Sequence, residues 1–405
     1  MISQRQSVRP IRGLHSDARH LTSTPRSNPA PPGSVTAVAA AAICALLAAC
    51  GPHEHVGSAP PLATAERVVH YYNWANYIGP DTIPAFEAAT GIKVIYDAYD
   101  AEETLETVIL MGDTGYDVVG ASMGTFAPGI AAGAFMPLDR ARLPNWRHLD
   151  PHALSVLGQF DPGNRYAVPF LHSINGFAYN LDMVRARMPD APVDSLDMLF
   201  KPAVVARFAD CGVSFLDSPV DVIQLALTYL HLDPNSGRAE DYQAVEALLL
   251  AVRPSIRLFD SNTYIHDLAN RELCLAMSWS SDYSIAMMRA RDVGLDLHLA
   301  FSVPREGANI NYDALLIPAG APHPGAAHVF LNYLLEPRVI AHVTNTLHSG
   351  NNNRTANAYV EPWILADPAL YPPPQVEARL YFSLPVTEKV RRLRTRTWTR
   401  IKTGH

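Results

Sequence analysis

The order of strand-like and helix-like segments after residue 67 constrains the fold of this chain more than any other feature of its sequence. Residues 68–73, 93–99 and 116–120 are rich in β-branched and aromatic residues and predict strands. After the first strand, turn and N-cap residues at 80–82 and Pro84 predict a helix that runs to about residue 90, where Gly91 can cap it. Residues 101–111 carry apolar side chains at helical spacing and predict a second helix. Strands and helices in this order form a parallel sheet with helices on its faces. The sequence therefore predicts an α/β fold.

Later segments repeat this pattern. Strands are predicted at 212–217, 273–278 and 309–318, and a helix is predicted at 221–230. A chain of 405 residues is too long for one ordinary hydrophobic core, which favours two lobes.

The expected lobes are each built from two separate stretches of the chain. We expect lobe 1 to combine residues 68–171 with 309–353, and lobe 2 to combine 172–308 with 354–405. Because the chain then crosses between the lobes several times, they are able to close about a hinge.

The first 49 residues have the composition of an export signal. They begin with a stretch containing five Arg and one acid, followed by an apolar run at 35–49 that is too short to span a bilayer comfortably. Small residues before Cys50 resemble the bacterial lipobox, in which the cysteine is lipidated. We therefore expect a lipoprotein signal peptide, a lipid anchor at Cys50 and a tether over 50–67. Ordinary signal cleavage and a helical anchor are the alternatives, and the long basic stretch leaves the start codon open.

The charge of the chain bears on its partners. The formal net charge is −7, and removal of the signal, with five Arg and one Asp, leaves a more acidic body. An acidic body argues against nucleic acid as a partner. A basic run near the C-terminus is the exception, and we predict that it forms the solvated face of a terminal helix: Arg391, Arg392, Arg394, Arg396, Arg400 and Lys402.

The four cysteines divide into two groups. Cys44 lies in the signal and Cys50 is the expected anchor, so Cys211 and Cys274 remain as an even pair in an exported protein. A disulfide between them is the economical interpretation. The chain has no C-x-x-C motif, so neither zinc nor thiol redox chemistry is expected, and we predict no metal and no cofactor.

The predicted strands end in aromatic residues and carboxylates. In open α/β sheets, ligands bind beyond the carboxyl ends of the strands. A tryptophan there can also be a core residue, and an aspartate can be a turn or cap residue. No G-x-G-x-x-G follows the first strand, which disfavours a nucleotide phosphate. The residues in question are Trp74, Tyr77, Trp279, Tyr312, Asp221, Asp282 and Asp313.

Several segments in nearly fixed order from residue 68 to the C-terminus resemble the periplasmic putrescine-binding proteins. The resemblance implies a bilobed periplasmic-binding-protein fold of type II, a periplasmic monomer that serves the permease of an ABC importer, and no catalysis. The segments are Tyr-Asn-Trp-Ala-Asn-Tyr-Ile at 72–78, Thr-Gly-Tyr-Asp at 114–117, Cys-Gly-Val-Ser-Phe-Leu-Asp at 211–217, Asp-Leu-Ala-Asn at 267–270, Trp-Ser-Ser-Asp at 279–282, Val-Pro-Arg-Glu-Gly-Ala at 303–308, Phe-Leu-Asn-Tyr-Leu-Leu at 330–335 and Arg-Thr-Arg-Thr-Trp-Thr at 394–399.

The resemblance also implies roles for individual residues. Trp74 and Trp279 would be aromatic walls around the carbon chain of a diamine, and Asp282 and Asp313 would bind its ammonium groups, with Asp221 assisting. Methylenes gain apolar burial and cation–π attraction on indole faces, and each ammonium requires acceptors. Other lining positions match Tyr77, Ser122 and Ser261, and the family disulfide matches Cys211 and Cys274.

The chain departs from the family pattern at the expected site. A serine and an aspartate of the family become Ala75 and Asn76, a wall Phe becomes Asn311, and a lining Tyr becomes Ser349. The pocket is therefore expected to be wetter and one carboxylate poorer. The ligand would be putrescine held less tightly, a longer polyamine, agmatine, or a cation with one neutral end.

Two other functions fit parts of the sequence. Residues 120–124 match the G-x-S-x-G motif of serine hydrolases, with Ser122 as the nucleophile, but that motif must lead into a helix, and Pro128 and Gly129 follow closely. A receptor that presents its ligand to a membrane sensor would use the same lobes. His53 and His55 offer only part of a metal coordination shell.

Overall fold

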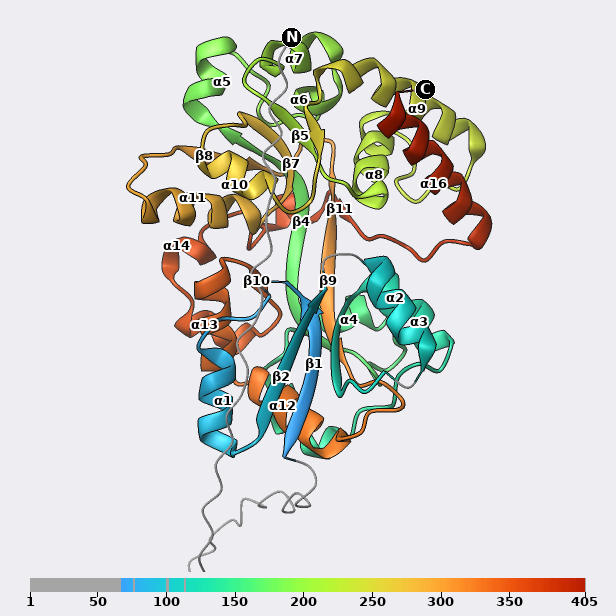
Figure 1. Cartoon of the computed structure of the whole chain (residues 1–405), viewed down its shortest axis with the longest axis vertical. Helices are drawn as coiled ribbons and strands as arrows, with labels where there is room; N and C mark the ends of the chain where they lie inside the picture. The colour runs from blue at the N-terminus through green and yellow to red at the C-terminus, as the bar shows by residue number, and fades with distance from the viewer. Residues whose placement is uncertain (1–66, 76, 100–101, 113, 405) are drawn as a thin grey trace, which may run out of the picture. The chain divides into compact units, whose positions relative to one another are not determined.

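The computed structural model describes residues 67–75, 77–99, 102–112 and 114–404 (Figure 1). Its strands are β1 (Val68–Trp74), β2 (Lys93–Tyr99), β3 (Val118–Ser122), β4 (Val168–Asn180), β5 (Val213–Phe215), β6 (Leu258–Phe259), β7 (Leu275–Trp279), β8 (Leu299–Ser302), β9 (Ala308–Leu316), β10 (Gly350–Asn351) and β11 (Leu380–Tyr381).

Helices separate most of these strands. The α-helices are α1 (Thr82–Thr90), α2 (Glu102–Met111), α3 (Met123–Ala131), α4 (Pro151–Leu157), α5 (Leu181–Arg187), α6 (Asp197–Phe200), α7 (Pro202–Val205), α8 (Pro219–Tyr229), α9 (Ala239–Val252), α10 (Tyr264–Ala269), α11 (Asp282–Asp292), α12 (Pro324–Leu334), α13 (Pro337–Leu347), α14 (Pro362–Leu365), α15 (Pro374–Glu377) and α16 (Glu388–Thr403). Short 3-10 helices are η1 (Arg140–Arg142), η2 (Pro144–His148), η3 (Ala206–Phe208), η4 (Arg253–Ser255) and η5 (Arg354–Tyr359).

The first strands and helices form as the residue pattern predicts. β1 pairs in parallel with β2 on one side and with β3 on the other. Between β1 and β2, α1 ends at Gly91, whose φ of +70° gives the left-handed cap that glycine adopts without strain. In Figure 1, α1 and α13 lie on one side of β1 and β2, and α2 and α3 lie on the other. The predicted α/β fold is confirmed.

Two long strands connect two groups of strands. β4 pairs with β9 and β10 in its first half, and with β7 and β8 in its second half. β9 also pairs with β3, and all these pairings are antiparallel. The parallel pairs β1–β2, β1–β3, β5–β6 and β5–β7 lie toward the two ends of the sheet, so each group combines parallel and antiparallel strands.

Buried apolar side chains form two clusters. One gathers around β1, α12 and α13 and includes Tyr71, Phe86 and Phe330, none of which is exposed. The other extends over α6–α11 and β5–β7, where it includes Phe200 and Phe215, and it also contains side chains of β1, β2, β3, α2 and α3. The second cluster therefore crosses between the two predicted lobes, and the lobe boundaries predicted above stay predictions.

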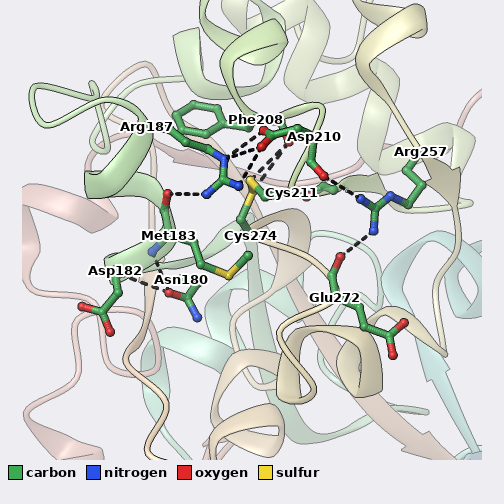
Figure 2. The surroundings of a disulfide bond; sticks show 11 residues. Asn180, Asp182, Met183, Arg187, Phe208, Asp210, Cys211, Arg257, Glu272 and Cys274 are labelled. Atoms are coloured by element: carbon green, nitrogen blue, oxygen red, sulfur yellow. Dashed lines mark hydrogen bonds and ion pairs between the residues drawn. A yellow bond between two sulfur atoms is a disulfide. The ribbon is translucent and has the colours of Figure 1, made fainter.

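The predicted disulfide between Cys211 and Cys274 is confirmed. Their Cα atoms are 5.6 Å apart, and the bond joins residues that precede the neighbouring parallel strands β5 and β7. Figure 2 shows its surroundings. Arg187 forms an ion pair of 2.7 Å with Asp210, and the Arg257 guanidinium donates to the Glu272 carbonyl at 2.6 Å.

The basic C-terminal run lies on α16, as predicted, but several of its side chains are paired. Arg400 forms an ion pair with Glu246 at 2.5 Å, and Lys402 forms one with Asp217 at 2.7 Å. The run therefore also ties α16 to its neighbours.

Candidate functional site

Three carboxylates are buried without forming an ion pair: Asp221 and Asp282 lie in the first turns of α8 and α11, whereas Asp313 lies within β9 and not at a strand end as expected. Asp221, Asp282 and Asp313 are 8%, 9% and 7% exposed, and among the described residues none of them forms an ion pair. Burial raises the pKa of each to about 6. Because an unpaired buried carboxylate is costly, three of them make this region complementary to a cation.

Asp313 lies within β9, in the part of that strand that pairs with β3. Its neighbour across the strands is Ser122. The Tyr77 hydroxyl donates a hydrogen bond of 2.5 Å to its carboxylate and thereby offsets part of the pKa rise. Burial raises the pKa of Tyr77 itself, and the negative charges of Asp313 and Asp282 raise it further. The Tyr77 hydroxyl is thus close enough to both carboxylates to experience their charges.

A second acidic group lies beside Asp313. The Ser122 hydroxyl hydrogen-bonds to the Glu102 carboxylate at the start of α2. The pKa of Tyr99 is raised by burial first, then by Asp313 and Glu102, so both charges lie near its hydroxyl. The Trp74 ring packs on Tyr99 with centroids 4.5 Å apart. Trp74 therefore packs on a tyrosine whose hydroxyl lies near the carboxylates of Asp313 and Glu102.

Asp282 is the first residue of α11. Its carboxylate accepts hydrogen bonds from the Tyr264 hydroxyl and from the Ser281 hydroxyl, the latter at 3.1 Å. Both bonds lower its pKa against the larger effect of burial. Tyr264 is completely buried, so this carboxylate is held in a fixed position.

Asp221 lies in the first turn of α8, next to Trp279. Ser218 caps the helix by accepting from the Asp221 backbone N–H at 3.4 Å. After burial, which raises the pKa of Asp221, the Ser218 hydroxyl, the Arg394 charge, the Trp279 indole and the Asn175 amide each lower it. The Trp279 indole is therefore close to the Asp221 carboxylate.

The remaining sequence candidates are less closely connected. Asn311 is half-buried and pairs with Ser173 across β4 and β9, and Ser349 is buried just before β10. The Ser261 hydroxyl accepts from the Asp217 N–H at 3.0 Å, and among the described residues no hydrogen bond joins it to Asp282. Asn76 lies outside the described residues.

Sequence patterns missed two side chains of this group. Glu102 was expected only as part of a helix, and Tyr264 precedes its partner Asp282 by 18 residues. Neither is at a strand end, so the strand-end rule does not select them. Only the pairing in three dimensions identifies them.

The hydrolase alternative is not supported, although one argument against it was wrong. A helix does follow Ser122 directly, because α3 begins at Met123 and continues through Pro128. The backbone of Ser122 has ordinary extended angles, φ −73° and ψ 163°, whereas a nucleophile elbow is strained. Its hydroxyl binds a carboxylate rather than a histidine.

Metal ligands do not gather in the part of the chain that the structure describes, where no group of three acidic, histidine or cysteine side chains is placed to hold an ion. His53 and His55 lie outside that part. In the same described residues, no helix is both long and apolar enough to cross a bilayer.

A family comparison covers most of the chain. The family described as bacterial extracellular solute-binding protein matches residues 81–372.

Characterised relatives match over nearly their whole length. The putrescine-binding periplasmic protein PotF of Escherichia coli (strain K12) is 42% identical over 346 residues, which cover 85% of this chain and 93% of the relative. A putrescine/agmatine-binding protein of Pseudomonas aeruginosa is 41% identical over 341 residues, covering 84% of this chain and 93% of the relative.

A solved structure shares the fold. The spermidine/putrescine ABC transporter substrate-binding protein PotD from Streptococcus pneumoniae aligns with a TM-score of 0.71 and 22% identity, covering 84% of this chain and 99% of that one. At this identity the likeness shows the fold alone.

Proposed function

The chain belongs to the bacterial extracellular solute-binding proteins, and we propose that it captures putrescine or a related polyamine and delivers it to an ABC importer. The observation that carries the proposal is the set of buried, unpaired carboxylates Asp221, Asp282 and Asp313. Relatives at 41–42% identity are named for putrescine and agmatine binding, which gives the cation its chemical class.

The chemistry of the site suits a short chain with cationic ends. An ammonium offers three donors, and a carboxylate is its best acceptor. Trp74 and Trp279 would cover the methylenes between the ends, where burial of each CH₂ contributes about 0.8 kcal/mol. Asp313 with Tyr77 would bind one end, and Asp282 and Asp221 would bind the other.

Capture would involve closure of two lobes. The proposed lobes are 68–171 with 309–353 and 172–308 with 354–405, and β4 and β9 are the strands that connect them. A ligand that contacts carboxylates of both lobes binds the closed form more tightly and shifts the population toward it. Asn76, Ser122, Ser261 and Asn311 are proposed as further lining residues.

The family and the composition of residues 1–50 support a proposal for where the protein works. We place it in the periplasm as a monomer, held to a membrane by lipid on Cys50. Labelling with a radioactive fatty acid tests the anchor: wild type should carry label and Cys50→Ser should not. A role in presenting the ligand to a membrane sensor uses the same ligand site, and neighbouring permease and ATPase genes would favour the importer.

A thermal-shift panel tests the function. The protein lacking residues 1–49 and carrying Cys50→Ser should be heated with putrescine, cadaverine, agmatine, spermidine and neutral amino acids. A ligand that binds only the folded state raises the melting temperature, because at a free ligand concentration of one hundred times Kd it stabilises that state by about 2.7 kcal/mol. Polyamines should raise it and neutral amino acids should not. No shift with any polyamine contradicts the proposal.

A further inference from the structure

Asn175 is a buried polar residue that no strand-end pattern marks. It lies within β4 and pairs directly with Trp279 of β7. Paired residues of antiparallel strands project from the same face of a sheet, so the carboxamide lies beside the indole. The residue is 2% exposed, and neither its Nδ2 nor its Oδ1 has a hydrogen-bond partner among the described residues.

Asp221 is the third member of this group. The Asn175 amide is close enough to the Asp221 carboxylate to lower its pKa slightly, against the larger effect of burial. The two groups nevertheless do not meet with the geometry of a hydrogen bond. The carboxamide is therefore beside the carboxylate, with its donor and its acceptor both uncommitted.

An unpaired carboxamide is a costly group to bury. Leaving a buried donor or acceptor unsatisfied costs about 1–3 kcal/mol, and Asn175 has both. An apolar side chain of similar size would avoid that cost. A polar side chain at this position is therefore explained best by a group that pairs with it from outside the protein.

We propose that Asn175 is a ligand-binding residue, which with Asp221 receives the end of the ligand chain that lies on Trp279. This inference rests on the proposed function. The Asn175 Oδ1 and the Asp221 carboxylate supply acceptors on one side of the indole, and the Nδ2 is free to donate to Asp221 once the site is ordered. The complementary head is a cationic nitrogen group with several N–H donors, either an ammonium or a guanidinium.

The test uses Asn175→Leu, which keeps the volume and removes both polar atoms. Calorimetry with putrescine and with agmatine should show Kd rising roughly tenfold for the ligand whose head binds there, the loss of one to two hydrogen bonds to a charged group. The ligand with the larger change shows whether an ammonium or a guanidinium occupies the subsite. The melting temperature of the ligand-free variant should stay the same or rise, because an unsatisfied polar group has been removed.

These opposite changes separate a ligand contact from a structural role. Unchanged Kd for both ligands in a folded Asn175→Leu protein overturns the inference, and Asn175→Ala replaces that variant if it does not fold. The control is Ser214→Ala in β5, which removes a different buried polar group, a hydroxyl without a partner among the described residues, and should leave Kd unchanged. If the wild type binds no polyamine at all, the proposed function fails; if it binds and Asn175→Leu binds equally, only this inference fails.

Discussion

The Tyr77 hydroxyl donates a hydrogen bond of 2.5 Å to the Asp313 carboxylate. The two residues are 236 positions apart in the chain, and Tyr77 also experiences the charge of Asp282. The Tyr77 hydroxyl is thus bonded to a carboxylate of β9 and lies near a second carboxylate at the start of α11. This relationship gives the proposed cation site its centre and leads to the first predictions.

Removing the charge at Asp313 or Asp282 should weaken diamine binding. Asp313→Asn and Asp282→Asn each leave one ammonium poorly paired, and we expect Kd for putrescine to rise at least tenfold in each variant. Calorimetry measures the change. Asp217→Asn is the control, since that carboxylate pairs with Lys402 and should not affect binding. Unchanged affinity in both site variants would remove these residues from the site.

Tyr77→Phe should act on binding through Asp313. The variant loses a hydrogen bond to a charged acceptor, and the net contribution of such a bond is about 1.5–3 kcal/mol. Because that bond lowers the pKa of Asp313, its loss raises the pKa further. The pH midpoint of putrescine binding should therefore move upward, which a titration of Kd against pH detects. A higher Kd with an unchanged pH midpoint of binding would contradict this role.

Binding should strengthen as pH rises through about 6. The pKa values of Asp221, Asp282 and Asp313 are each raised to about 6, so below that pH the carboxylates are protonated and pair poorly with ammonium. Affinity should fall by roughly tenfold per pH unit for each group that must lose its proton. Kd measured from pH 4.5 to 8 should level off above pH 7, and a flat profile would contradict the assignment.

The same raised pKa values should destabilise the ligand-free protein as pH rises. Each folded-state pKa lies above the ordinary value of 3.8, so the folded state binds the proton more tightly than the unfolded chain does. The stabilisation is present below the unfolded pKa and is lost as pH rises to about 6. The melting temperature of Asp313→Asn minus that of wild type should therefore increase from pH 4 to 7; a decrease would be the wrong sign.

Reduction of the disulfide should lower stability without altering the ligand site directly. The bond closes a loop between residues separated by 63 positions, and the chain-entropy model gives about 4 kcal/mol for a loop of this size. Urea unfolding of Cys211→Ser with Cys274→Ser measures the loss. Putrescine Kd under native conditions should change little, and an intact free energy of unfolding would contradict the structural role.

Asn76→Asp should strengthen putrescine binding if the lost carboxylate weakens it. The aspartate would make a charge-assisted hydrogen bond to the cation in place of a neutral one. A hydrogen bond to a charged group contributes about 1.5–3 kcal/mol. Competition between putrescine and agmatine measures whether the gain is specific. No gain for either ligand would show that position 76 does not contact the cation.

The amino-acid sequence by itself determined the local elements and the residue types of the site. β-Branched runs set β1 and β2, Gly91 ended α1, and an even pair of cysteines predicted the disulfide, because each depends on neighbouring residues or on simple pairing. The carboxylates of the proposed site were also visible from the pattern of the sequence, although Asp313 lies within β9 rather than at a strand end.

Only the tertiary structure decided which of those groups meet. The contacts of Tyr77 with Asp313, Tyr264 with Asp282, and Glu102 with Ser122 each depend on how separate segments pack. Such packing is long-range and leaves no periodic signal in the chain. The same holds for Asn175, whose burial beside Trp279 follows from the antiparallel register of β4 and β7 rather than from any motif. α3 also continues through Pro128, the sixth of its nine residues, where a proline removes a backbone hydrogen bond and local rules therefore disfavour a helix.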